Sequence, residues 1–251
     1  MASLKRIMRH DPKAELAFAP PSRVGGWRPR LLDGGLSAIA AQAATGKAPK
    51  LRRRKRLFDL VMGSVLIVLL APFMALIAGL VKLDGGPALF GHRRVGADGR
   101  TFPCWKFRTM VPNADAVLAD LLRSDPAARA EWDRDFKLRA DPRITFIGRF
   151  LRVSSLDELP QLFNVIAGEM SLIGPRPIVA EEVARYGEAY RYYCACRPGM
   201  TGIWQVSGRN RVDYRRRVLY DQQYATGWSF ILDLSLLCRT VVVVTRGSGA
   251  Y

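Results

Sequence analysis

An uncharged apolar run at residues 60–81 constrains the fold of this chain more than any other feature. The run, "LVMGSVLIVLLAPFMALIAGLV", is long enough to cross a bilayer as a helix. Pro72 interrupts it, and a proline removes one backbone donor and clashes with the preceding turn, so a kink or break is expected there. Cations flank both ends, with "RRRKR" at 52–56 before the run and Lys82 directly after it. Length favours a span, whereas the proline and the two basic flanks favour a hairpin that enters and leaves one leaflet.

The rest of the chain divides around this run. Residues 1–50 mix Ala, Pro, Gly and Arg without sustained periodicity, which predicts a basic, disordered tail. Residues 51–83 hold the basic flank and the membrane segment, and residues 84–251 form a folded domain. Near its end, "WSFILDLSLLCRTVVVV" contains Asp233 and Arg239, each of which would cost about 2.5–3.5 kcal/mol at mid-bilayer. This segment is therefore expected to be an interfacial or packed helix rather than a second span.

Charge and cysteine content narrow the class of protein. The chain carries 39 Lys+Arg against 22 Asp+Glu, a formal net charge of +17. Such an excess indicates a polyanionic partner: nucleic acid, anionic lipid headgroups or phosphorylated substrates. The four cysteines form no C-x-x-C pair, which argues against a structural zinc site and favours reduced thiols in a cytosol-facing protein.

Two patterns predict secondary structure after the membrane segment. Asp98-Gly99 lies between two apolar runs, which predicts a β-hairpin with its turn at residues 97–99. Residues 113–139 have helical patterning that Pro126 interrupts. Strands and helices are thus both expected in the folded domain.

The segment at 154–177, "SSLDELPQLFNVIAGEMSLIGPRP", places two adjacent acids in a strongly basic chain. Ser155 and Glu158 match a capping box, in which the acids would only stabilise a helix start. Pro160 does not suit that box, because it falls past the first turn, where its missing amide matters. Either the helix begins later or its first turn is distorted, and the acids then belong to a site.

Adjacency limits what Asp157 and Glu158 can do as a site. Neighbouring side chains on a helix point about 100° apart, so the two carboxylates would act on different atoms rather than share one proton. One suits a nucleophile and the other a ligand to a hard cation. A helix N-terminus favours the ionised forms that both roles require.

Basic residues near this segment indicate the substrate class. Lys106 and Arg108 alternate around Phe107, so they share one face if the segment is a strand. Arg152 precedes the acids, and Arg176 stands between two prolines that restrict its backbone. Each alone suits a surface charge, but together with two acids they indicate a phosphate-rich substrate.

Motifs in this order resemble one family. They are "KRLFDL", "KFRTM", "SSLDELPQLFNVIAGEMSLIGPRP", "RPGMTGIWQVSGRN" and a closing "GAY", over about residues 55–251. The chain resembles the bacterial sugar transferases, the monotopic polyprenyl-phosphate phosphoglycosyl transferases that begin exopolysaccharide and O-antigen assembly. Members have a re-entrant helix broken at Ser-Pro, where this chain has Ala71-Pro72. The resemblance favours the hairpin and implies an α+β fold: a re-entrant membrane helix hairpin, then a small, mostly helical catalytic domain with a short β-hairpin and interfacial helices.

The resemblance also implies a reaction and its residues. The family transfers a sugar 1-phosphate from a UDP-sugar to undecaprenyl phosphate on the cytoplasmic leaflet of the inner membrane, with Mg²⁺, and releases UMP. The nucleophile falls on Asp157 and the magnesium ligand on Glu158, while "WQVSGRN" and "GAY" favour galactose or glucose as the sugar. The residues expected to bind substrate phosphates are Lys106, Arg108, Arg152 and Arg176. Those expected to bind the nucleotide sugar are Gln161, Asn164, Arg197, Gln205 and Arg209.

The expected partners are undecaprenyl phosphate, a UDP-sugar and anionic inner-membrane lipids, with no nucleic acid. The sequence leaves open whether the chain forms a homo-oligomer. Two alternatives also stay open: a membrane-anchored, non-catalytic module that binds polyanions or lipid, and a single-span enzyme whose exported domain acts on another phosphate ester. The first does not explain why "DELPQ" and "GPRP" occur together.

Overall fold

The computed structural model describes residues 53–135, 138–208 and 212–245. The predictions for the tail at 1–50, for Arg209 and for the closing "GAY" fall outside these residues. The helices are α2 (Arg53–Lys82), α3 (Ala114–Ser124), α4 (Pro126–Asp135), α5 (Phe146–Ser154), α6 (Gln161–Ala167), α7 (Tyr190–Cys194), α8 (Ile203–Val206), α9 (Tyr214–Gly227) and α10 (Phe230–Thr245). The strands are β1 (Leu89–Val95), β2 (Thr101–Phe107), β3 (Ser171–Ile173) and β4 (Gly199–Thr201). The expected mixture of helices with a short β-hairpin is confirmed.

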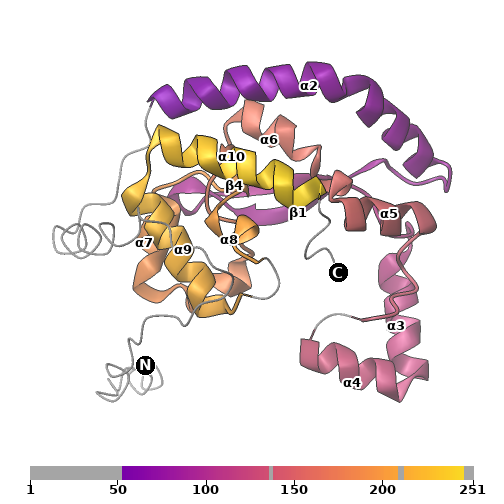
Figure 1. Cartoon of the computed structure of the whole chain (residues 1–251). Coiled ribbons are helices and arrows are strands. Elements are labelled where there is room, and N and C mark those ends of the chain that lie inside the picture. The colour runs from indigo at the N-terminus through magenta and orange to yellow at the C-terminus, as the bar shows by residue number, and fades with distance from the viewer. Residues whose placement is uncertain (1–52, 136–137, 209–211, 246–251) are drawn as a thin grey trace, which may run out of the picture.

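The apolar run forms one helix, α2, with Pro72 inside it. One side of α2 packs on the fold, so Ile77 and Val81 are buried, whereas Val68 and Leu69 on the other side are exposed. Figure 1 shows α2 along the outside of the molecule, beside α6, with a bend in its second half. Of the helices that the structure describes, α2 alone is long and apolar enough to cross a membrane.

The predicted helix–break–helix hairpin is not confirmed. The backbone stays helical through Pro72, and α2 bends without doubling back (Figure 1). A proline removes one intrahelical hydrogen bond and displaces the preceding turn, which is enough to bend a helix. A reversal of direction would require residues to leave the helical conformation altogether. The structure therefore has a bent apolar helix where the sequence predicted two helices.

The hairpin of β1 and β2 forms as predicted. The strands pair antiparallel from Leu89 opposite Phe107 to Val95 opposite Thr101. Between them, Asp98 and Gly99 adopt the left-handed backbone conformation, with φ of 56° and 72°. The Asp-Gly signal worked because these two residue types tolerate that conformation better than most.

Helices α3 and α4 meet at the predicted proline. Pro126 is the first residue of α4, where its missing amide costs no hydrogen bond. The carboxylate of Asp125 accepts hydrogen bonds from the backbone N–H groups of Ala127 and Ala128, at 2.8 and 3.1 Å. These two helices project away from the rest of the fold (Figure 1).

The second sheet holds the "GPRP" segment in place. β3 and β4 pair in parallel, with Ser171 opposite Gly199 and Ile173 opposite Thr201. The backbones approach so closely that a Cβ at Gly199 would lie 2.0 Å from the Gly174 nitrogen, which explains a glycine at this position. Residues 175–177 follow β3 directly and are thereby fixed against β4.

Candidate active site

The acids lie in a turn between two helices. α5 ends at Ser154, and Ser155 closes it in the left-handed conformation, with φ of 59°. A single 3₁₀ turn, Leu156–Glu158, follows, and α6 begins only after Pro160. The side chain of Ser155 makes no capping hydrogen bond. The capping box is therefore not formed, and the helix begins later than the box implies, which was the other possibility that Pro160 raised.

Lys106 brings the two carboxylates together. Its Nζ lies 2.7 Å from Glu158 Oε1 and 3.5 Å from Asp157 Oδ2. Asp157 is only 8% exposed, whereas the side chain of Glu158 is 36% exposed. Although the acids are neighbours, one lysine thus reaches both, with Asp157 on the buried side and Glu158 toward solvent.

Burial sets the protonation of this group. Burial raises the pKa of Asp157, and Glu158 adds to this effect, while the charges of Lys106 and Arg152 oppose it. Burial alone would lower the pKa of Lys106, but the carboxylates of Glu158 and Asp157 raise it overall, so the lysine is protonated. We expected a helix N-terminus and nearby cations to favour the ionised aspartate. That expectation is wrong in direction, because Asp157 lies ahead of Pro160 and is buried.

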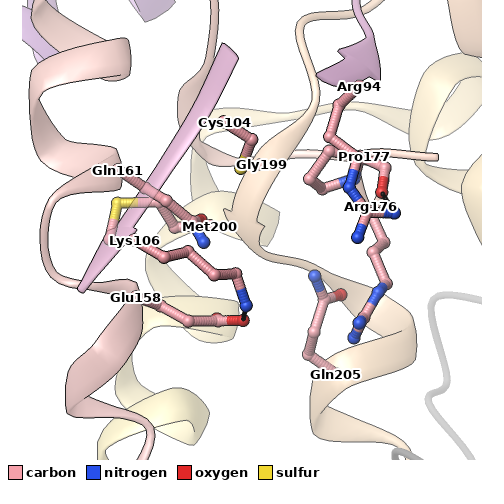
Figure 2. Close-up of a pocket in the computed structure, with 10 residues that line it drawn as sticks. All are labelled: Arg94, Cys104, Lys106, Glu158, Gln161, Arg176, Pro177, Gly199, Met200 and Gln205. Atoms are coloured by element: carbon pink, nitrogen blue, oxygen red, sulfur yellow. Dashed lines mark hydrogen bonds and ion pairs between the residues drawn. The ribbon is translucent and has the colours of Figure 1, made fainter. Parts of the chain in front are cut away.

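A pocket opens beside the acids (Figure 2). Its lining residues are Arg94, Cys104, Lys106, Glu158, Gln161, Arg176, Pro177, Gly199, Met200 and Gln205. Figure 2 shows Lys106, Glu158 and Gln161 on one side, with Arg94, Arg176 and Gln205 on the other. The pocket therefore has one wall with acids and a lysine and a facing wall with arginines.

Arg176 is held by its backbone and by an aromatic ring. Its guanidinium carbon lies 4.7 Å from the centre of the Trp204 ring, which Arg217 also approaches at 5.3 Å. Its backbone N–H donates to the carboxylate of Asp221, which also accepts a hydrogen bond of 2.7 Å from the Tyr186 hydroxyl. Burial raises the pKa of Asp221 to about 7.

Two other predicted arginines take different positions. Arg152, in the last turn of α5, donates from Nε to Thr109 Oγ1 at 2.9 Å, and its charge helps to lower the pKa of Asp157. Arg108 is not brought into the pocket. It pairs with Asp84 and donates to the carbonyl oxygens of Pro87, Val81 and Met110 at 2.7–2.9 Å. Arg108 thus fastens the end of α2 to the hairpin, because its side chain comes from the residue after β2 and lies off the pocket face.

The residues predicted to bind the nucleotide sugar are divided as well. Gln161 and Gln205 line the pocket. Asn164 is buried and holds β2, accepting from Trp105 N at 2.9 Å and donating to Pro103 O at 2.7 Å. Arg197 donates to Gly168 O at 2.7 Å and is not among the residues that line the pocket.

Comparison with known proteins follows the same residues. The family model for bacterial sugar transferases matches residues 51–247. The chain belongs to this family. An uncharacterized sugar transferase of Haemophilus influenzae is 56% identical over 197 residues, 78% of this chain and 42% of the relative. An undecaprenyl-phosphate galactose phosphotransferase of Salmonella typhimurium is 54% identical over 197 residues, 78% of this chain and 41% of the relative.

A shorter relative is matched over most of its length. The exopolysaccharide production protein ExoY of Sinorhizobium fredii is 48% identical over 198 residues, 78% of this chain and 88% of the relative. The chain spans about two fifths of the length of the first two relatives. The similarity to all three covers the part that contains the pocket.

In this sugar transferase, the sequence analysis missed Arg94 and Cys104 as residues of the pocket. Residues directly opposite on paired strands share one face, and the hairpin pairs Arg94 with Phe102 and His92 with Cys104. Phe90 pairs in the same way with Lys106, so Arg94, Cys104 and Lys106 all face the pocket side. The predicted turn at 97–99 already contained this register. Burial raises the pKa of the Cys104 thiol to about 11, so it is neutral and does not compete with Asp157 as a nucleophile.

Proposed function

We propose that this chain transfers a hexose 1-phosphate from a UDP-hexose to undecaprenyl phosphate and releases UMP, through a phosphosugar attached to Asp157. One observation carries the proposal. A buried carboxylate, Asp157, lies beside a protonated lysine in a pocket whose facing wall is cationic (Figure 2). Transfer of a phosphoryl group requires mainly a positioned nucleophile and cations around the phosphates, and this pocket offers both.

In the first step, a carboxylate oxygen of Asp157 attacks the phosphorus that carries the hexose. The bond from this phosphorus to the bridging oxygen breaks, and its electron pair leaves with UMP. Lys106 and Arg176 offset the charge of the phosphates during the attack. A carboxylate suits attack rather than proton removal here, because the donor has no proton that must leave.

In the second step, an oxygen of undecaprenyl phosphate attacks the same phosphorus. The bond to Asp157 breaks and regenerates the carboxylate, and the hexose phosphate is now joined to the lipid phosphate. This acceptor is already an anion, so no general base is needed. The neutral thiol of Cys104 and the protonated Lys106 are consistent with a site that does not depend on base catalysis.

Glu158 fits a role in holding Mg²⁺. Its side chain is partly exposed at the pocket, and carboxylate oxygen is a ligand that Mg²⁺ prefers. The described residues contain no group of three or more His, Cys, Asp or Glu that could hold a metal by themselves. A magnesium ion bound by one or two carboxylates, water and substrate phosphates fits that finding, and it would neutralise phosphate charge when bound.

Gln205 supports binding of the donor in this pocket. Its Oε1 is buried and accepts no hydrogen bond from any residue that the structure describes. A ligand with an N–H or O–H group, such as a uracil ring or a sugar hydroxyl, would satisfy it. Galactose or glucose is the proposed sugar, and the name of the Salmonella relative favours galactose.

The exposed apolar surface supports a position at the cytoplasmic face of the inner membrane. Val68 and Leu69 of α2 are about 70% exposed, and Phe146 of α5 is 91% exposed. Side chains of this size are stable at a lipid surface rather than in water. We propose that α2 enters this leaflet and that its bend keeps both ends on one side, where the soluble donor is found.

A screen of UDP-sugars with undecaprenyl phosphate, scored by UMP release, tests this function. We expect release from UDP-galactose or UDP-glucose that depends on added lipid for multiple turnovers. The Asp157→Asn protein is the matched control. Release from UDP-N-acetylgalactosamine, with none from the two hexose donors, would overturn the sugar assignment. No release from any UDP-sugar, by a protein that still binds polyanions, would favour the non-catalytic alternative.

A further inference from the structure

Arg94 has an unusual environment for an arginine on a β-strand. It is partly buried, points into the pocket from β1, and lies on the same side as Arg176 (Figure 2). Burial lowers the pKa of Arg94, and the positive charge of Arg176 lowers it further. The fold therefore holds two guanidinium groups close together, at an electrostatic cost that an anion between them would remove.

The protein does not supply that anion. Among the described residues, Arg94 has no ion pair, and its one hydrogen bond goes to the carbonyl oxygen of Pro177 at 3.4 Å. Glu182 attracts Arg94 from a distance, but its oxygens already accept from Arg217 Nη1 and from the backbone of Val179, both at 3.1 Å. The spare donors of Arg94 thus face the pocket.

We propose that Arg94 binds a phosphoryl group of a substrate and forms, with Arg176, the anion-binding wall opposite Asp157 and Glu158. The proposal rests on the proposed function, because it takes the pocket to be the substrate site. A guanidinium presents paired N–H groups that match two phosphoryl oxygens, and a ligand with two negative charges would offset both arginines. Such a phosphoryl group can come from the nucleotide donor or from the lipid acceptor.

The neighbouring residue gives a matched control. Arg93 is on the opposite face of β1, is exposed, and pairs across the hairpin with Pro103. Arg93→Gln and Arg94→Gln therefore remove the same charge from the same strand, one from each face. Arg94→Lys keeps the charge but loses the paired N–H geometry.

The experiment measures binding of UDP, uridine and a short-chain polyprenyl phosphate to the full chain in lipid nanodiscs. We expect Arg94→Gln to weaken binding of UDP or of the polyprenyl phosphate by about 10- to 100-fold, because a hydrogen bond to a charged group is lost. Arg93→Gln should stay within about twofold of wild type, and Arg94→Lys should fall between the two. Binding of uridine, which has no phosphate, should be unchanged in all variants.

The outcomes separate this proposal from the proposed function. Loss of UDP binding alone assigns Arg94 to the donor, and loss of polyprenyl phosphate binding alone assigns it to the acceptor. If Arg94→Gln binds both as tightly as Arg93→Gln, while wild type binds them and releases UMP, the inference about Arg94 is wrong and the proposed function stands. If wild type binds neither and releases no UMP, the proposed function itself fails. A melting curve identifies an unfolded variant, in which case Arg94→Lys decides: it supports the proposal if either affinity falls relative to Arg93→Gln and contradicts it otherwise.

Discussion

Two regions of this molecule place two carboxylates around one lysine, and only one of them has the features of a site. In the pocket, Lys106 Nζ lies 2.7 and 3.5 Å from Glu158 and Asp157. Between α2 and α10, Lys55 Nζ lies 2.9 Å from Asp233 and 3.8 Å from Asp59. The charges in the two clusters are the same, so charge alone does not distinguish a site from a structural tie.

The difference lies in what else bonds to the acids. In the cluster between the helices, Asp59 and Asp233 are 1% and 0% exposed. Their oxygens accept hydrogen bonds from the Ser171 hydroxyl, the Leu172 backbone, the Tyr224 hydroxyl and the Trp228 indole. Of the buried oxygens in this cluster, only Asp59 Oδ2 has no partner among the described residues. The protein itself thus satisfies nearly all of this cluster, which joins α2 to α10.

In the pocket, the acids border open space rather than other donors. Glu158 lines that space, and Arg94 and Arg176 face it from the other side. Cations and carboxylates that are not fully paired with one another remain able to bind a ligand. The comparison teaches that bonding capacity left unused inside the protein, rather than the number of charges, marks the functional cluster.

The largest effect should come from Asp157→Asn. The change keeps the shape of the side chain but removes the nucleophile, so UMP release should fall by about 10⁴-fold or more. Stability should be nearly unchanged, because the fold does not gain by burying this carboxylate, whose pKa is raised. Turnover and a denaturant midpoint measured on one preparation check both parts. Residual turnover within tenfold of wild type would place the nucleophile elsewhere.

Substitution of the two lysines by methionine compares the clusters directly, and Lys55→Met should be the more destabilising. It leaves two buried carboxylates without their cation, which should cost about 3–5 kcal/mol of unfolding free energy. Chemical denaturation in detergent measures the loss. An equal loss for Lys106→Met would show that the pocket cluster is also a structural tie.

Lys106→Met should instead reduce catalysis and shift its pH dependence. Loss of a cation beside the transferred phosphate should lower turnover by about 10²-fold. Burial already raises the pKa of Asp157, and without Lys106 it should rise further, by about one unit. Since attack requires the ionised carboxylate, the acidic side of the pH–rate profile should move to higher pH. A profile that does not move would contradict the coupling between the two residues.

The smallest effect should come from Asp221→Asn, which changes how Arg176 is held. Burial raises the pKa of Asp221 to about 7, so wild type is largely ionised at pH 8 and largely protonated at pH 6. The variant should therefore raise the KM for the donor by about two- to fivefold at pH 8 and match wild type at pH 6. A KM difference of the same size at both pH values would show that the charge of Asp221 plays no part.

Local signals predicted much of this fold. The Asp-Gly turn at 97–99 and the helix boundary at Pro126 depend on the backbone preferences of a few residues, which the sequence states directly. The bend of α2 was harder, because a proline indicates a disturbance but not whether the helix bends or reverses. That outcome depends on packing against α6 and α10.

The site was predicted less completely than the hairpin. Lys106, Glu158 and Arg176 were found from their motifs, and the structure places all three in one pocket. Arg108 was grouped with Lys106 by strand alternation, which ceased to apply once β2 ended at Phe107. Arg94 was missed because its partner across the hairpin had not been paired with it, although the turn already set the register.

Intact-mass spectrometry tests the central claim most directly. The enzyme is incubated with UDP-galactose or UDP-glucose without lipid acceptor and then denatured. Wild type should gain the mass of one hexose phosphate and lose it when a polyprenyl phosphate is added, and Asp157→Asn should gain nothing. The account would be contradicted if Asp157→Asn acquired the same adduct, or if wild type released one equivalent of UMP without carrying any adduct.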